Sequence, residues 1–144
     1  MNEPASATVR APAHLWIVGV LGVLWNAYGC FDYVMKQAGG PSYLAALPPA
    51  EATMLAQMAV WANVAWAIGV WGGLLGCVLL LLRRRWAAHA FRLSLLGAAL
   101  GTAYQVRHLP PMNSTDWALT IAILMVCVAL LIYARWQTAR GILR

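Results

Sequence analysis

The sequence predicts an all-α integral membrane protein, built as an antiparallel bundle of four transmembrane helices in a single domain over residues 14–136. Two observations predict this class. Hydrophobic residues make up 62% of the 144 residues and charged residues only 10%, whereas soluble domains carry more charge. Four apolar runs are each long enough for the roughly 20 residues of a membrane-spanning helix, and segments rich in proline, glycine or arginine separate them.

The first predicted helix covers about residues 14–36. It follows residues 1–13, which hold two prolines and no apolar periodicity and which we expect to form a disordered cytoplasmic tail. Small and polar residues recur along the helix at alternating steps of three and four, so they share one face. Lipid already solvates apolar faces, and such a stripe therefore marks where another helix backbone comes close, with Asn26 hydrogen-bonding inside the contact. The stripe consists of Gly19, Gly22, Asn26, Gly29 and Tyr33.

The second predicted helix covers about residues 50–82. The preceding residues 37–49 hold two glycines and three prolines, which prevent a continuous helix, and residues 42–47 can form one amphipathic turn on the membrane surface. A helix of this length exceeds the hydrocarbon thickness, so we expect it to tilt or to project from the membrane. The three arginines at positions 83–85 end it.

Glycines predict close packing in the second and third helices. They recur one turn apart on two adjacent faces of the second helix, and the third helix carries a stripe with the spacing seen in the first. We expect contacts within the bundle; the alternative is that the second glycine face of the second helix meets another protein. The residues are Gly69 and Gly73 on one face of the second helix, Gly72 and Gly76 on the other, and Ser94, Gly97, Gly101, Tyr104 and His108 on the third.

The third and fourth helices are predicted over about residues 86–107 and 116–135. The third is the least apolar, because His89 and Arg92 lie in its first turns and have to reach the interface. Residues 137–144 are expected to form a short basic cytoplasmic tail. The expected capping residue of the fourth helix is Ser114 or Thr115, with Asp116 near its positive end.

Arginine and lysine positions predict the orientation. Basic residues near the ends of the spans favour the cytoplasmic side, and eight of the ten lie on the side of the two termini and the second connection. Both termini are therefore expected in the cytoplasm of a bacterium, with the protein in the inner (plasma) membrane and the Pro-rich loops facing outward. The eight are Arg10, Arg83, Arg84, Arg85, Arg92, Arg135, Arg140 and Arg144; Lys36 and Arg107 lie on the other side.

On this topology a set of polar residues falls in the outer half of the membrane or at its outer edge, and the inner half is much more apolar. Asp32 is the most informative, because a carboxylate within a span is costly unless it faces a partner or a water-filled cavity. One interpretation is a local ion pair with Lys36 one helical turn later. The alternative is an outward-facing pocket in which the carboxylate meets His108, Arg107 or Tyr104 and holds a small polar solute or a proton. The candidate pocket residues are Tyr28, Asp32, Tyr33, Asn63, Tyr104, Gln105 and His108.

Residues for other chemistries are sparse. The three cysteines form no CxxC pair, and we expect them to pack as small apolar residues. His14 and His89 lack the further ligands that a haem or metal site needs. Neither a phosphate-binding loop nor a nucleophile elbow occurs. We therefore expect no catalytic residue, no metal and no cofactor, and the net charge of +6 reflects orientation in the membrane rather than nucleic-acid binding.

Several stretches resemble a small bacterial family of four-span membrane proteins whose members are often labelled sugar transporters. They are residues 15–29 (LWIVGVLGVLWNAYG) followed by Asp32 and Tyr33, residues 65–72 (AWAIGVWG) and residues 94–97 (SLLG). The resemblance covers nearly the whole chain and is least visible in residues 37–51. It implies kinship and four spans, and it carries over no catalytic or substrate residue.

These observations favour a non-enzymatic inner-membrane protein that acts through helix contacts, such as an accessory or scaffold subunit. Lipid surrounds it, and we expect a homo-oligomer or a larger membrane complex. The alternative is an oligomeric transporter of a small polar, sugar-like solute with its pocket around Asp32. Four spans leave little room for two gates around a midplane site, so a transporter of this size would have to dimerise.

Overall fold

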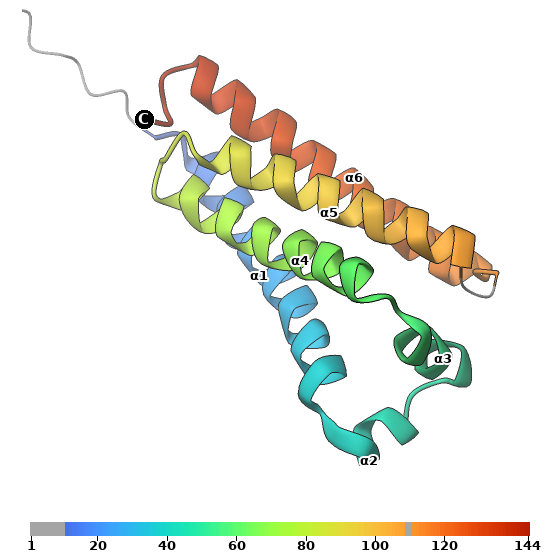
Figure 1. Ribbon diagram of the computed structural model, residues 1–144. Coiled ribbons are helices and arrows are strands. Elements are labelled where there is room, and N and C mark those ends of the chain that lie inside the picture. The colour runs from blue at the N-terminus through green and yellow to red at the C-terminus, as the bar shows by residue number, and fades with distance from the viewer. Residues whose placement is uncertain (1–10, 109–110) are drawn as a thin grey trace, which may run out of the picture.

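The structure is a computed structural model that describes residues 11–108 and 111–144, and over these residues every regular element is a helix (Figure 1). Three helices, α1, α4 and α6, are long and apolar enough to cross a membrane. The 22-residue α5 is not among the three, because it carries basic residues near both ends. In chain order the helices are α1 (Ala13–Ala38), α2 (Gly40–Ala45), α3 (Pro49–Gln57), α4 (Val60–Leu81), α5 (Ala87–His108) and α6 (Ser114–Ala139).

The long helices alternate in direction. Figure 1 shows α4, α5 and α6 side by side, with α1 crossing α4. The start of α1, the α4–α5 turn and Arg144 lie at one end, which we call the arginine end; α2 and α3 lie at the other, which we call the loop end. The buried core gathers at the arginine end. It consists of Leu15, Cys77, Leu80, Ala87, Ala88, Phe91, Leu130, Ala134, Ile142 and Leu143.

The contact between α4 and α5 is backbone against backbone. A Cβ atom added to Gly97 would lie 2.5 Å from the carbonyl oxygen of Ala65 and 2.7 Å from the amide nitrogen of Gly69. Ser94 crosses the same contact, since its hydroxyl donates a hydrogen bond of 2.6 Å to the Gly69 carbonyl and is buried. Small residues therefore set the separation of these two helices, as is common in membrane helix pairs.

Both glycine faces of α4 are occupied within the chain. Gly72 lies against the backbone of Ser94, and a Cβ on Gly76 would lie 2.6 Å from the ring of Phe91. Gly73 lies under the side-chain oxygen of Asn26 from α1. The glycines of both faces therefore make the expected contacts within the bundle, because α1 and α5 pack on α4 from two sides, and the alternative of a face left for another protein gains no support.

The contact between α1 and α4 widens toward the loop end. Near the arginine end Gly22 faces Cys77, and a Cβ there would lie 2.7 Å from the sulfur. Asn26 follows, and its Nδ2 donates to the Gly22 carbonyl at 2.8 Å and to the Cys77 sulfur at 3.5 Å. At the far side Tyr33 packs edge-on against Trp66, with 4.9 Å between ring centroids. Because the side chains in the contact grow from glycine to aromatic, α1 diverges from α4 (Figure 1).

Two of the expected packing glycines have no tight contact. A Cβ added to Gly29 would meet only Val70, at 3.6 Å, which is an ordinary van der Waals distance. Around Gly101 nothing lies within 4 Å. By contrast Gly19 faces Leu81 closely. The glycines of the stripes on α1 and α5 thus make tight contacts only toward the arginine end, whereas at the loop end the stripes pack through Tyr33 and Tyr104.

The predicted second helix over residues 50–82 is not continuous. It is divided into α3 and α4, because Met58 and Ala59 have extended backbone with ψ of 122° and 145°. The hydroxyl of Tyr104 from α5 occupies the break, donating to the Gln57 carbonyl at 2.8 Å and accepting from the Ala59 amide at 3.0 Å. This side chain therefore satisfies backbone groups that the interruption leaves without helical partners.

The fourth helix begins and ends differently from the prediction. Asn113, rather than Ser114 or Thr115, is its N-cap: its side chain accepts from the Asp116 amide at 2.9 Å, and the Asp116 carboxylate accepts from the Asn113 amide at 3.2 Å. This reciprocal pair is a capping box. At the other end the helix continues to Ala139, four residues beyond the expected end.

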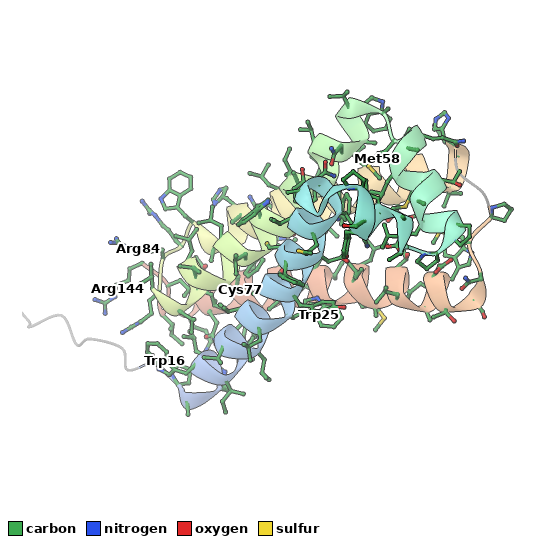
Figure 2. All side chains as sticks on the ribbon, turned by 90° about the horizontal axis from the view of Figure 1, so that it is seen from below. Trp16, Trp25, Met58, Cys77, Arg84 and Arg144 are labelled. Atoms are coloured by element: carbon green, nitrogen blue, oxygen red, sulfur yellow. The ribbon has the colours of Figure 1, made fainter. Side chains whose placement is uncertain are left out.

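The C-terminal residues fold back onto the core and do not form a free tail. Gly141 has a φ of +70°, and the Ile142 amide donates to the Gln137 carbonyl at 3.0 Å, which is the Schellman end of a helix. Ile142 is buried as a result. Arg144 then pairs with the α4–α5 turn and lies beside Arg84 (Figure 2): its amide donates to the Arg83 carbonyl at 2.7 Å, and its carbonyl accepts from the Arg85 amide at 3.0 Å. The apolar residues inside this basic segment explain why it packs.

Candidate functional site

A cavity of about 360 Å³ lies at the loop end, and we call it the Lys36 cavity. Four helices contribute to it, since the short α2 and α3 cover the space between the diverging ends of α1 and α4. Polar groups come from α1 and α4 and apolar groups mainly from α2 and α3. The lining residues are Lys36, Gln37, Leu44, Ala52, Leu55, Ala56, Met58 and Asn63.

Lys36 is the charged centre of this site. Its ammonium lies 2.8 Å from the Asp32 carboxylate and also contacts the carboxylate of Glu51 at the start of α3. The ammonium further lies 5.8 Å from the centre of the Trp66 ring, within the range of a cation–π contact. Only 11% of the lysine side chain is exposed. Two carboxylates around one ammonium leave the cluster with a formal charge of −1.

An amide pair closes the site beside this cluster. Gln37 and Asn63 exchange two hydrogen bonds, each 3.1 Å long, and so join the end of α1 to the first turn of α4. The pair uses one donor and one acceptor of each side chain, so each amide keeps a further hydrogen-bonding position. A small polar molecule in the cavity would therefore meet amide groups on one wall and the lysine cluster beside them.

Tyr104 lies behind this cavity. Its hydroxyl holds the break between α3 and α4, next to the Met58 side chain that lines the cavity. Its ring is fixed from two sides: the Trp61 ring meets it edge-on at 5.2 Å, and the His108 ring lies 4.9 Å away. Tyr104 therefore supports the wall of the site and is connected to it through the backbone.

The structure divides the seven predicted pocket residues into separate groups. Asn63 lines the Lys36 cavity, and Asp32 reaches it through the ion pair. Tyr104 and His108 form the aromatic group behind the helix break. Tyr33 packs on Trp66, Tyr28 is 72% exposed on the surface of α1, and Gln105 is half-buried on α5.

Of the two interpretations of Asp32, the structure therefore shows the ion pair with Lys36. Tyr104 contacts the His108 ring and the helix break, and the Asp32 carboxylate contacts Lys36. Sequence reasoning missed Glu51 as the second partner of Lys36. One signal could have found it: the chain has four acidic residues in all, and Glu51 lies two residues after Pro49, in the first turn of α3.

Comparison with family models, with curated proteins and with solved structures gave no match to this chain. The resemblance to the four-span family thus stays a prediction. Chemical inference about the site depends on the geometry described above.

Proposed function

We propose that the protein is a small, non-enzymatic, multi-pass protein of the bacterial inner membrane that acts through helix contacts as an accessory or scaffold subunit. One observation carries the proposal. In the most apolar 18-residue stretch of α6, only 11% of the residues are buried inside the protein. The exposed residues of this helix include large apolar ones, among them Trp117, Ile121 and Met125. A helix with so little internal contact offers its length to lipid and to a partner helix.

The proposal takes α5 as the fourth span. This helix lies between α4 and α6 and contacts both, so a membrane around those two helices would also enclose α5. Its length of 22 residues suffices for the hydrocarbon core. Arg92 and Arg107 lie toward its two ends, from which long side chains reach the interface.

Thiol labelling tests the proposed orientation. An impermeant maleimide added outside intact cells is expected to modify a cysteine placed at Met112 and to leave one placed at Arg84 unmodified, because basic residues gather at the arginine end. Lysed cells provide the control, since both positions should then react. Modification of position 84 in intact cells would reverse the orientation.

Crosslinking in the native membrane, followed by native mass spectrometry, tests the subunit role. A stable complex with a different protein, crosslinked through cysteines on the outward face of α6, supports the proposal. Ile121→Cys is a suitable probe because this side chain is half-exposed, and Leu130→Cys is the matched control because that residue is buried in the core. Equal crosslinking at both positions, or an isolated monomer, contradicts the subunit role.

The second candidate function is transport of a small polar, sugar-like solute by an oligomer. The Lys36 cavity favours it, because amides and a charged cluster line a space of about 360 Å³ at the outward end. Members of the family that the chain resembles are also often labelled in this way. Within this proposal Asp32 positions Lys36 rather than meeting the solute alone.

Paired substitutions distinguish a passive ion pair from a transport site. Asp32→Asn removes one of the two carboxylates on Lys36, and for a passive, partly wet pair we expect a loss of at most about 1 kcal/mol in the free energy of unfolding. In a transport site the same variant would fold and lose uptake. Liposomes with wild type, Asp32→Asn or Tyr28→Phe, a change on the exposed face of α1, are assayed for counterflow of small sugars. Lack of uptake by folded wild type removes the transport function.

A further inference from the structure

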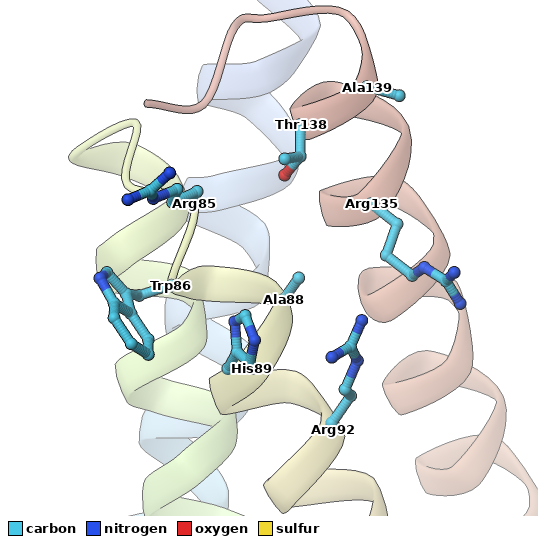
Figure 3. A pocket seen from close by; sticks show the side chains of 8 residues that line it. All are labelled: Arg85, Trp86, Ala88, His89, Arg92, Arg135, Thr138 and Ala139. Carbon is cyan, nitrogen blue, oxygen red and sulfur yellow. The ribbon is translucent and has the colours of Figure 1, made fainter.

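A second cavity lies at the arginine end, on the surface between α5 and α6. It measures about 540 Å³, and we call it the arginine cavity (Figure 3). Its lining is strongly basic. The residues are Arg85, Trp86, Ala88, His89, Arg92, Arg135, Thr138 and Ala139.

No side-chain carboxylate in the described part of the chain forms an ion pair with an arginine of this cavity. Neither of the two ion pairs found there involves an arginine of the cavity, since both belong to Lys36. The three acidic residues that the structure describes, Asp32, Glu51 and Asp116, all lie toward the loop end. Several guanidinium groups around one hollow repel one another, and an anion between them would remove that repulsion.

The arrangement of donors suits a phosphate group. Figure 3 shows His89 and Arg92 extending from α5 and Arg135 on the neighbouring stretch of α6, where its long side chain runs along the helix, with Thr138 above the gap. Guanidinium groups donate paired hydrogen bonds to phosphate oxygens. The Thr138 hydroxyl already donates to the Ala134 carbonyl at 2.8 Å, so the donors of this site are the basic side chains. A carboxylate is smaller and offers fewer oxygens to a site with three arginines.

The helix surfaces below the basic rim are apolar and partly exposed. Leu96 lies one helical turn deeper than Arg92 on the same face of α5, and 56% of its surface is exposed. Leu131 lies one turn deeper than Arg135 on α6 and is half-buried. At the rim, the exposed Trp86 ring lies 5.1 Å from that of His89. Tryptophan at this level is typical of the boundary between headgroups and hydrocarbon.

We propose that the arginine cavity binds the phosphate of an anionic phospholipid, with the acyl chains lying along the leucines of α5 and α6. A free phosphate ion shares the headgroup chemistry, but it would make no use of the apolar walls below the rim. The inference rests on the proposed membrane insertion. It does not depend on a protein partner or on transport. Lipid binding can therefore succeed even if thiol labelling contradicts the proposed orientation or crosslinking contradicts the subunit role.

Competition for a labelled lipid tests the proposal. Phosphatidylglycerol with a fluorescent acyl chain is bound to the full chain in neutral detergent, and its anisotropy is followed as competitors are added. We expect displacement by unlabelled phosphatidylglycerol, and far weaker displacement by phosphatidylcholine or inorganic phosphate. If inorganic phosphate displaced the labelled lipid at the same concentration as unlabelled phosphatidylglycerol does, the cavity would be a site for free anions. Equal displacement by phosphatidylcholine would identify a nonspecific lipid surface. Either outcome overturns the proposal.

Two double variants with equal loss of charge locate the site. Arg92→Gln with Arg135→Gln removes two cavity arginines and is expected to weaken phosphatidylglycerol binding about thirtyfold. Arg84→Gln with Arg140→Gln removes two arginines at the same end that do not line the cavity. The cavity pair should therefore bind phosphatidylglycerol at least about tenfold more weakly than this control pair. Equal losses in the two pairs would show that binding depends on diffuse surface charge, contrary to the proposal.

A charge-conserving pair keeps the test valid if the glutamine pair does not fold, as judged by circular dichroism. Arg92→Lys with Arg135→Lys retains both charges but cannot form the paired hydrogen bonds of guanidinium. It is expected to bind phosphatidylglycerol more weakly than wild type while still preferring it to phosphatidylcholine. Unchanged affinity in the lysine pair would contradict direct recognition of phosphate by the two arginines.

Discussion

Replacing Gly97 by alanine is expected to lower the free energy of unfolding by roughly 1–3 kcal/mol. The added Cβ would lie 2.5 Å from the Ala65 carbonyl oxygen and 2.7 Å from the Gly69 amide nitrogen, and both of these are backbone atoms. No rotamer change relieves such a contact, so α4 and α5 have to separate. Separation would also stretch the 2.6 Å hydrogen bond from Ser94 to Gly69.

Gly101→Ala is the matched control, because it lies on the same helix one turn later and has nothing within 4 Å. Its free energy of unfolding should be unchanged or slightly raised, since alanine favours the helix over glycine. Unfolding is followed by circular dichroism as dodecyl sulfate is added to protein in mild detergent. Equal stability of the two variants would show that backbone contact does not set the separation of α4 and α5.

Tyr104→Phe is expected to open the break between α3 and α4. Loss of the hydroxyl leaves the Gln57 carbonyl and the Ala59 amide without their partner, and a partly buried hydrogen bond of this kind contributes roughly 0.5–1.5 kcal/mol. The ring and its contacts with Trp61 and His108 remain, so the helices should stay packed. The opening should therefore be local.

Thiol modification at Met58→Cys measures this opening, with peptide-resolved mass spectrometry separating this site from the three native cysteines. The rate of modification should rise at least about fivefold in Tyr104→Phe, which corresponds to a change of about 1 kcal/mol. Tyr33→Phe is the control, because its ring packs on Trp66 and its hydroxyl has no hydrogen bond within the described residues. An equal rise in both variants would assign the effect to general loosening.

The long helices could be predicted from the sequence because apolar runs and the Pro-rich or Arg-rich segments between them are local signals. The first helix, predicted over 14–36, is found at Ala13–Ala38, and the third, predicted over 86–107, at Ala87–His108. The break at Met58 could not be predicted in this way. No glycine or proline marks it, and its stabilising partner, Tyr104, lies 45 residues away in the sequence.

The sequence of the C-terminal residues carries a local signal for their packing. Gly141 followed by Ile142 has the pattern of a helix end closed by glycine and an apolar residue. The neighbouring arginines are the features on which the prediction of a short basic tail depends. Of the candidate site, only the pair of Asp32 and Lys36 followed from helical spacing. The contribution of Glu51 depends on how α2 and α3 fold back, which local spacing does not specify.

The uneven distribution of the core implies a gradient in hydrogen exchange along the molecule. Backbone amides at the arginine end lie among Phe91, Leu130 and other buried side chains, so they should exchange only through global opening. The helices α2 and α3 contain no buried residue, so their backbone amides should exchange through small, frequent local openings. The Lys36 cavity therefore lies in the part of the molecule that opens locally, and the arginine cavity lies in the part whose amides exchange only through global unfolding.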